Sequence, residues 1–245
     1  MNKLLWIRYD TKPRSDPDLW WQAVSRGLRD LWTGATYLVP GNMLAVVLAP
    51  LALFTPPIIG AIWWAAAQIA REENVTFAEM IQAGRRLAVP MWKWALINLF
   101  AYGVTLFNIY LYGTGQAALP FAAGETLISV LTGFWIATIL WWTVYALFVT
   151  GWLVFEESTV KEALRGALVL IIRHYLFEML MALVMAVVAA LHALLFVIIF
   201  VITLALLATL SVRSVQLLNH GIPIPIPPEE QAKRYAELHR QEEEA

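Results

Sequence analysis

Long apolar tracts, separated by short polar stretches, dominate the chain. The tracts cover residues 36–70, 91–112, 126–155 and 174–212. A helix needs about 20 apolar residues to cross a bilayer, so each middle tract is long enough for one crossing and each outer tract for about two. The pattern predicts an all-α fold: a polytopic membrane helical bundle with about six transmembrane helices.

The two outer tracts need internal turns. A Thr-Pro-Pro sequence at 55–57 divides the first tract into two short crossings, about 38–54 and 57–70, and a re-entrant hairpin is the alternative. The last tract contains no glycine or proline, so its length alone favours a helical hairpin that turns near His192. One long helix is the alternative there.

Two polar stretches between the tracts are copies of each other. Each begins with a T-x-x-E pattern, in which Thr76 corresponds to Thr159 and Glu79 corresponds to Glu162. In such a capping box the threonine oxygen and the glutamate carboxylate each accept a hydrogen bond from the other residue's backbone N–H. The pattern therefore predicts that a helix starts at each copy.

Apolar residues follow at helical spacing in both copies, opposite a polar face that carries arginine or lysine. They predict two amphipathic cytoplasmic linker helices at the membrane surface, about 71–90, where a proline ends the helix, and about 156–172. With the adjoining tracts they give an internal repeat within a transmembrane domain, 36–218. Its halves are about 36–112 and 125–218.

The two ends of the chain are more polar. We expect residues 1–35 to form a cytoplasmic tail and an amphipathic interfacial helix, and residues 219–245 to form a cytoplasmic tail that is extended at its Ile-Pro run. The helix starts at Ser15 and lies either among lipid headgroups or against the protein's own cytoplasmic side. Its apolar face is Trp20, Trp21, Val24, Leu28 and Leu31, and its polar face is Gln22, Ser25, Arg26, Arg29 and Asp30.

The distribution of charge predicts the orientation. All 17 Lys and Arg residues lie in segments 1–37, 71–93, 156–173 and 213–245, which the six-span arrangement places on one side. Because basic residues favour the cytoplasmic side, we expect a multi-pass protein of the bacterial plasma (inner) membrane with both termini and both linker helices in the cytoplasm. A formal net charge of −1 gives no reason to expect a nucleic-acid partner.

Ionisable residues inside an apolar tract are functional candidates, because a charge in a bilayer is costly. Arg173, His174 and Glu178 form one such cluster, since Glu178 lies one helical turn after His174. The cluster is either a proton-linked pair or polar substrate contact, or simply the cytoplasmic end of a span. The second interpretation is favoured.

Two acidic pairs, Glu72 with Glu73 and Glu156 with Glu157, precede the two capping boxes. They could bind a cation or the basic patch of a partner. The favoured alternative is that they mark the cytoplasmic ends of two spans.

The sequence contains few residues or motifs that indicate a catalytic, metal or cofactor site. The chain has no cysteine, which removes disulfides, thiolate metal sites and cysteine nucleophiles. It also lacks H-E-x-x-H, G-x-S-x-G and a phosphate-binding glycine loop. We therefore predict no catalytic, metal or cofactor site, and a protein that is not an enzyme.

One region of the chain resembles a known family. Asn42, Pro50, the Thr-Pro-Pro turn at 55–57, Gly60 and the acidic pair after Arg71, followed by the linker helix and a tryptophan-rich span, resemble the YesL-like family of bacterial integral membrane proteins of unknown function. The resemblance covers mainly residues 40–110. It implies an all-helical inner-membrane protein whose relatives are often encoded near carbohydrate ABC transporters.

The sequence thus predicts a non-enzymatic accessory or scaffold to a transport system, with carbohydrate uptake as the implied process. Its partners would be the lipid bilayer and components of a carbohydrate ABC transporter. The alternative is a small transporter or lipid-handling membrane protein, because many carriers are built from internal repeats.

Overall fold

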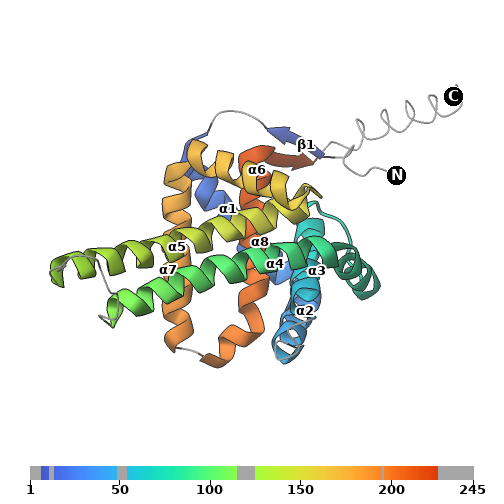
Figure 1. The fold of residues 1–245 in the computed structure, drawn as a ribbon. Coiled ribbons are helices and arrows are strands. Elements are labelled where there is room, and N and C mark those ends of the chain that lie inside the picture. The colour runs from blue at the N-terminus through green and yellow to red at the C-terminus, as the bar shows by residue number, and fades with distance from the viewer. Residues whose placement is uncertain (1–6, 11–13, 49–53, 115–124, 195, 226–245) are drawn as a thin grey trace, which may run out of the picture.

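The computed structural model describes residues 7–10, 14–48, 54–114, 125–194 and 196–225. In these ranges the chain forms eight helices and two short strands (Figure 1). Their bounds, in chain order, are β1 Ile7–Asp10, α1 Asp16–Thr33, α2 Ala35–Leu48, α3 Thr55–Ala70, α4 Phe77–Gly113, α5 Glu125–Phe155, α6 Val160–Arg173, α7 Tyr175–Leu194, α8 Phe196–Asn219 and β2 Ile222–Pro225.

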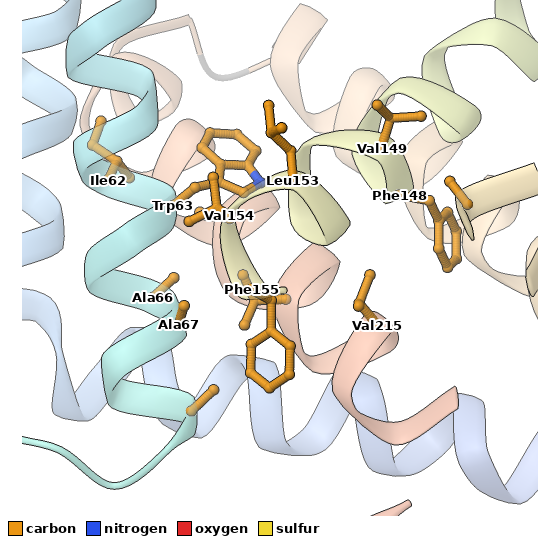
Figure 2. Close-up of a cluster of buried hydrophobic side chains, with 14 of the residues drawn as sticks. Ile62, Trp63, Ala66, Ala67, Phe148, Val149, Leu153, Val154, Phe155 and Val215 are labelled. Atoms are coloured by element: carbon orange, nitrogen blue, oxygen red, sulfur yellow. The ribbon is translucent and has the colours of Figure 1, made fainter. Parts of the chain in front are cut away.

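The core forms where α3, α5 and α8 meet, and α8 also packs against α1 and α2. Figure 2 shows the apolar side chains at this junction, including Trp63 of α3, Phe148 of α5 and Val215 of α8. Small residues bring the helices close together. A Cβ at Gly151 of α5 would lie 3.0 Å from the backbone oxygen of Ser211 in α8, so glycine is needed there for close packing.

Helices α4 and α5 lie side by side and extend beyond the rest of the bundle (Figure 1). We call residues 94–113 of α4 and 125–144 of α5 the apolar arm; its base, at Trp94 and Val144, is buried in the core. Large apolar side chains are exposed along it, including Phe100 at 74% and Leu140 at 62% of full exposure. Such a surface is typical of a protein that contacts lipid or another apolar partner.

The predicted count of six crossings is not supported. By length and composition, three of the described helices could cross a membrane alone: α4, α5 and the 202–219 part of α8. The number rises to five if two bent pairs each count as one span, α1 with α2 (87°) and the pair 160–173 with 175–188 (102°). For the two crossings expected at about 38–54 and 57–70, the described helices are shorter than the roughly 20 residues that a crossing needs: α2 has 14 residues and α3 has 16. Residues 49–53, which belong to the first of these crossings, lie outside the described residues.

The first linker helix is not a separate element. It was predicted to end at Pro90, but α4 continues through this proline to Gly113. A proline inside a helix removes one hydrogen bond and bends the helix without having to end it. Met91 and Trp94, both 3% exposed, pack into the core directly after the proline and hold the helix on its course.

The second linker helix, α6, is separate as predicted, because the chain bends at His174 between α6 and α7. The two copies share only the order helix, loop and capped helix, in α3–loop–α4 and α5–loop–α6. They differ after the capping boxes, because α4 continues to Gly113 and α6 ends at Arg173, so the predicted repeat halves are not confirmed. The last tract does form two helices, which end at Leu194 and begin at Phe196, close to the predicted turn.

Helix α1 packs against α7 and α8, as in the second of the two predicted placements. The predicted apolar face was wrong by about one residue. The buried side of α1 carries Leu19, Ala23, Gly27 and Asp30, while Leu28 is 50% exposed. A Cβ on Gly27 would lie 2.9 Å from the side chain of Leu210, so the small residues mark where α8 crosses α1.

The segments before α1 and after α8 pair with each other. Strand β1 runs antiparallel to β2, with Ile7 opposite Pro225 and Asp10 opposite Ile222. Part of the expected N-terminal tail is therefore structured. The extended Ile-Pro run is confirmed for 222–225, and the rest of the C-terminal tail lies outside the described residues.

Candidate functional site

Both predicted capping boxes are present. The Glu79 N–H donates to Thr76 Oγ1 at 3.3 Å, and the Thr76 N–H donates to Glu79 Oε2 at 3.0 Å. The second copy has the same two bonds, at 3.3 Å and 2.8 Å, between Thr159 and Glu162. The two boxes fix where α4 and α6 begin, and hence the shape of the loop before each helix.

The acidic pairs lie directly after helix ends, as expected. Helices α3 and α5 each end in a Schellman motif, in which an N–H donates to the carbonyl five residues earlier. The Glu73 N–H donates to the Gln68 carbonyl at 2.9 Å, and the Ser158 N–H donates to the Leu153 carbonyl at 3.3 Å. The residue at the turn is Glu72 (φ 60°) or Glu157 (φ 50°), both in the left-handed region that favours glycine. A glutamate occupies the turn in both copies.

The first acidic pair opens onto a polar pocket of about 560 Å³ between α1, the α3–α4 loop and α8. We call it the polar pocket. It is lined by Arg29, Asp30, Thr33, Gly34, Tyr37, Ile69, Glu72, Glu73, Asn74, Val75, Thr76 and Arg213.

A buried ion pair forms one wall of the polar pocket. Arg213 Nη2 donates to Asp30 Oδ1 at 2.8 Å, and Arg213 Nε donates to the other carboxylate oxygen. Both side chains are 6% exposed. The guanidinium also donates to the Ala70 carbonyl at 3.0 Å and to Gln216 Oε1 at 2.7 Å. These bonds tie α8 to α1 and to the C-terminus of α3.

Arg213 corrects a sequence-based assignment. It was counted with the basic residues of the C-terminal region, but it lies inside α8 and is buried. Asp30 was assigned to the polar face of α1 and is buried as well. Sequence reasoning missed both, although an arginine six residues before the end of an apolar helix is a signal for a buried partner.

The rim of the polar pocket is acidic. Asp30 and Arg213 neutralise each other, so the remaining charged groups of the lining are Glu72, Glu73 and Arg29. Glu72 is exposed and Glu73 is partly buried. Two carboxylates against one guanidinium suit an incoming ammonium or guanidinium group.

The second acidic pair is used by the chain itself. Glu156 accepts hydrogen bonds from Asn219 Nδ2 at 2.8 Å and from His220 Nε2 at 2.7 Å. Burial acts to raise the pKa of Glu156, but these hydrogen bonds and the nearby charge of Arg71 outweigh it, and the pKa is lowered. Glu157 lies 3.5 Å from an arginine of α4. The two pairs thus have different environments.

Arg71 connects the two loops. Its Nη2 donates to the carbonyl of Phe155, the last residue of α5, and its guanidinium carbon lies 4.7 Å from the centre of the Phe155 ring. A cation at the C-terminus of a helix is favourable, because the carbonyl ends there carry partial negative charge. The arginine after α3 therefore caps the end of α5.

The candidate cluster of Arg173, His174 and Glu178 lies where α6 ends and α7 starts. In the described residues no ion pair joins Glu178 to His174 or Arg173; instead His174 Nδ1 lies 2.8 Å from Asp16 Oδ1 of α1. The Glu178 N–H donates to the His174 carbonyl, as expected in a first helical turn. The three residues therefore lie at the bend between α6 and α7, and His174 joins this bend to α1.

Within the described ranges, no three His, Asp or Glu side chains gather in a way that could hold a metal ion. Comparisons with protein-family models, with curated proteins and with solved structures give no match.

Proposed function

We propose that this chain is an integral membrane protein that serves as a non-enzymatic accessory or scaffold to a transport system. The observation that carries the proposal is the polar pocket, which Glu72 and Glu73 line beside a buried ion pair. In this proposal the pocket receives a basic segment of a partner protein. The apolar arm holds the protein in the bilayer.

The dimensions of the apolar arm support membrane insertion. Its two segments, 94–113 and 125–144, each rise about 30 Å at 1.5 Å per residue. This length matches the hydrocarbon core of a bilayer, which is about 30 Å thick. The exposed apolar side chains along the arm are suited to lipid or to the membrane helices of a partner.

The β1–β2 ribbon supports the predicted arrangement of the termini. Paired strands have to lie in the same compartment, so this pairing favours our proposal that the segments before α1 and after α8 share one side of the membrane. We therefore propose an even number of crossings, and four lies within the range that helix length allows. The basic residues favour the cytoplasm of a bacterium as that side.

The resemblance to the YesL-like family stays a prediction and gives the partner class. We propose a component of a carbohydrate ABC transporter as the partner that docks on the pocket. Its docking segment would carry Lys or Arg, because the rim presents two carboxylates against one guanidinium. A charged rim of this kind sets specificity and the rate of association more than affinity.

Purification from native membranes in polymer nanodiscs tests this proposal. After cross-linking, the wild-type protein should bring down a transport component that is identified by mass spectrometry. The double variant Glu72→Gln, Glu73→Gln should lose most of it. Glu157→Gln is the matched control, because Glu157 also has a positive φ and does not line the pocket. Equal recovery with all three proteins contradicts the proposal.

The alternative is a small transporter or lipid-handling protein, and the repeated helix–loop–helix favours it. Proteoliposomes that contain only this chain distinguish the two functions. Solute uptake or lipid transfer above that of empty liposomes supports the alternative, and no uptake is expected for an accessory protein.

A further inference from the structure

A second hollow, of about 560 Å³, lies between α2, α3 and the first turns of α4. We call it the apolar groove. We propose that it binds one acyl chain of an anionic phospholipid, with the lipid phosphate on Arg85. The inference deepens the membrane role proposed above by naming a ligand class, and it concerns a surface other than the polar pocket.

The walls of the groove are almost wholly apolar. Leu44 of α2, Phe54 before α3, and Phe77 and Ile81 of α4 all line it, and they are 48–59% exposed. Leaving such side chains in water is unfavourable by roughly 25 cal/mol for each Å² of apolar surface. An acyl chain covers them without requiring any polar partner.

The size of the groove fits one chain. Pockets that enclose most of a small ligand have volumes of about 300–1,000 Å³, and the apolar groove lies within this range. Gly84 forms part of the floor, where a Cβ would lie 3.1 Å from the carbonyl oxygen of Pro57. The absence of a side chain lets α4 approach α3 and keeps the floor smooth.

Arg85 gives the groove its charge. It is exposed, it lines the groove, and it lies one turn after Ile81 on α4. In the part of the chain that the structure describes, no carboxylate pairs with Arg85, whereas its neighbour Arg86 lies 3.5 Å from Glu157. A guanidinium binds phosphate through two parallel hydrogen bonds. An apolar groove with one unpaired arginine at its edge therefore matches an anionic lipid better than a neutral one.

The second copy of the repeat lacks both features. Leu168 of α6 takes the place that Arg85 has in α4, counted from the capping threonines Thr76 and Thr159. The groove also includes Pro40, Gly41 and Leu44 of α2, which precedes α3, whereas the helix before α5 is the much longer α4. The lipid site is therefore specific to the first copy, and α6 provides internal controls.

Native mass spectrometry in detergent tests the proposal. The purified chain is titrated with dioleoyl phosphatidylglycerol or with dioleoyl phosphatidylcholine, and the fraction with one bound lipid is measured. We expect tighter binding of phosphatidylglycerol. Arg85→Gln should weaken phosphatidylglycerol binding about tenfold or more, since a hydrogen bond to a charged group is worth at least that factor. Phosphatidylcholine has the same phosphate but no net charge, so the variant should weaken its binding less than that of phosphatidylglycerol.

A second variant tests the apolar walls. Ile81→Glu places a charge where the chain would lie and should abolish binding of both lipids. The matched controls are Arg165→Gln and Ile172→Glu, because both residues are exposed on α6. All four substitutions lie on the surface, and thermal melts confirm that each variant is folded.

Several results would overturn the proposal. These are equal binding of the two lipids to the wild type, no effect of Arg85→Gln, no effect of Ile81→Glu, or an equal loss in the α6 controls. The titration needs no bilayer and no partner protein. Its failure is therefore distinguishable from failure of the scaffold function, which is tested by co-purification.

Discussion

Removal of the Asp30 carboxylate should destabilise the fold more than any surface substitution. Arg213 makes two hydrogen bonds to Asp30 and one each to the Ala70 carbonyl and to Gln216. In Asp30→Ala the guanidinium keeps only its neutral partners, the Ala70 carbonyl and Gln216. The Arg213 side chain is only 6% exposed in the wild type. A buried charge is then left without its counter-charge.

The expected loss of stability in Asp30→Ala follows from the burial of the ion pair. Removing one partner of a buried ion pair costs about 3–5 kcal/mol. For a chain of this size, 1 kcal/mol corresponds to a change of roughly 2–4 °C in Tm, so Asp30→Ala should melt roughly 6–20 °C below the wild type. The double variant Asp30→Leu, Arg213→Met removes both charges and should melt within about 4 °C of the wild type or above it.

Thermal unfolding in mild detergent, followed by tryptophan fluorescence, measures these shifts. Arg86→Ala is the control, because it breaks an exposed ion pair whose side chains are 57% and 54% exposed. Such pairs contribute about 0–1 kcal/mol. The reasoning is refuted if Asp30→Ala melts like Arg86→Ala, or if the double variant is as unstable as Asp30→Ala.

Three further predictions concern the loops. Thr76→Ala and Thr159→Ala should each lower stability by about 0.5–2 kcal/mol in the same melt, whereas serine at either position should largely preserve it. Glu72→Gly and Glu157→Gly should raise stability by up to about 1 kcal/mol, because glycine adopts positive φ without strain; a lower Tm contradicts this. Burial acts to raise the pKa of Glu156, but hydrogen bonds outweigh it and lower this pKa below the ordinary value of 4.5. The ionised Glu156 therefore stabilises the fold fully above pH 4.5, the pKa of the unfolded state. This stabilisation is lost as the pH falls through the lower pKa of the folded state. The difference in Tm between the wild type and Glu156→Gln should therefore be constant near neutral pH and shrink in acid.

Features set by neighbouring residues could be predicted from the sequence. The capping boxes, the starts of α4 and α6, and the position of the acidic pairs at helix ends depend on side chains within a few residues of each other. Glu72 and Glu73 were identified as candidates for this reason, and they do line the polar pocket. Their difference from Glu156 could not be seen, because His220, its hydrogen-bond partner, lies 64 residues away.

Features set by distant packing were missed. The buried face of α1 depends on α8, which presses on Gly27 through Leu210. Asp30 alone is typical of a solvated helix face, and only its pairing with Arg213, 183 residues later, explains its burial. The continuation of α4 through Pro90 likewise depends on tertiary packing, and propensity alone favours a break.

The β1–β2 ribbon also sets the order in which the molecule is completed. Strand β1 is synthesised before the eight described helices and β2 after them, so β1 cannot pair with β2 until α8 has left the ribosome. The same holds for α1, whose buried face waits for α8. Contacts between segments this distant form late, because a long loop has to close before they bring any stabilisation. Assembly therefore finishes at the ribbon, and a chain that stops short of β2 leaves an unpaired strand edge that a quality-control protease or chaperone could recognise.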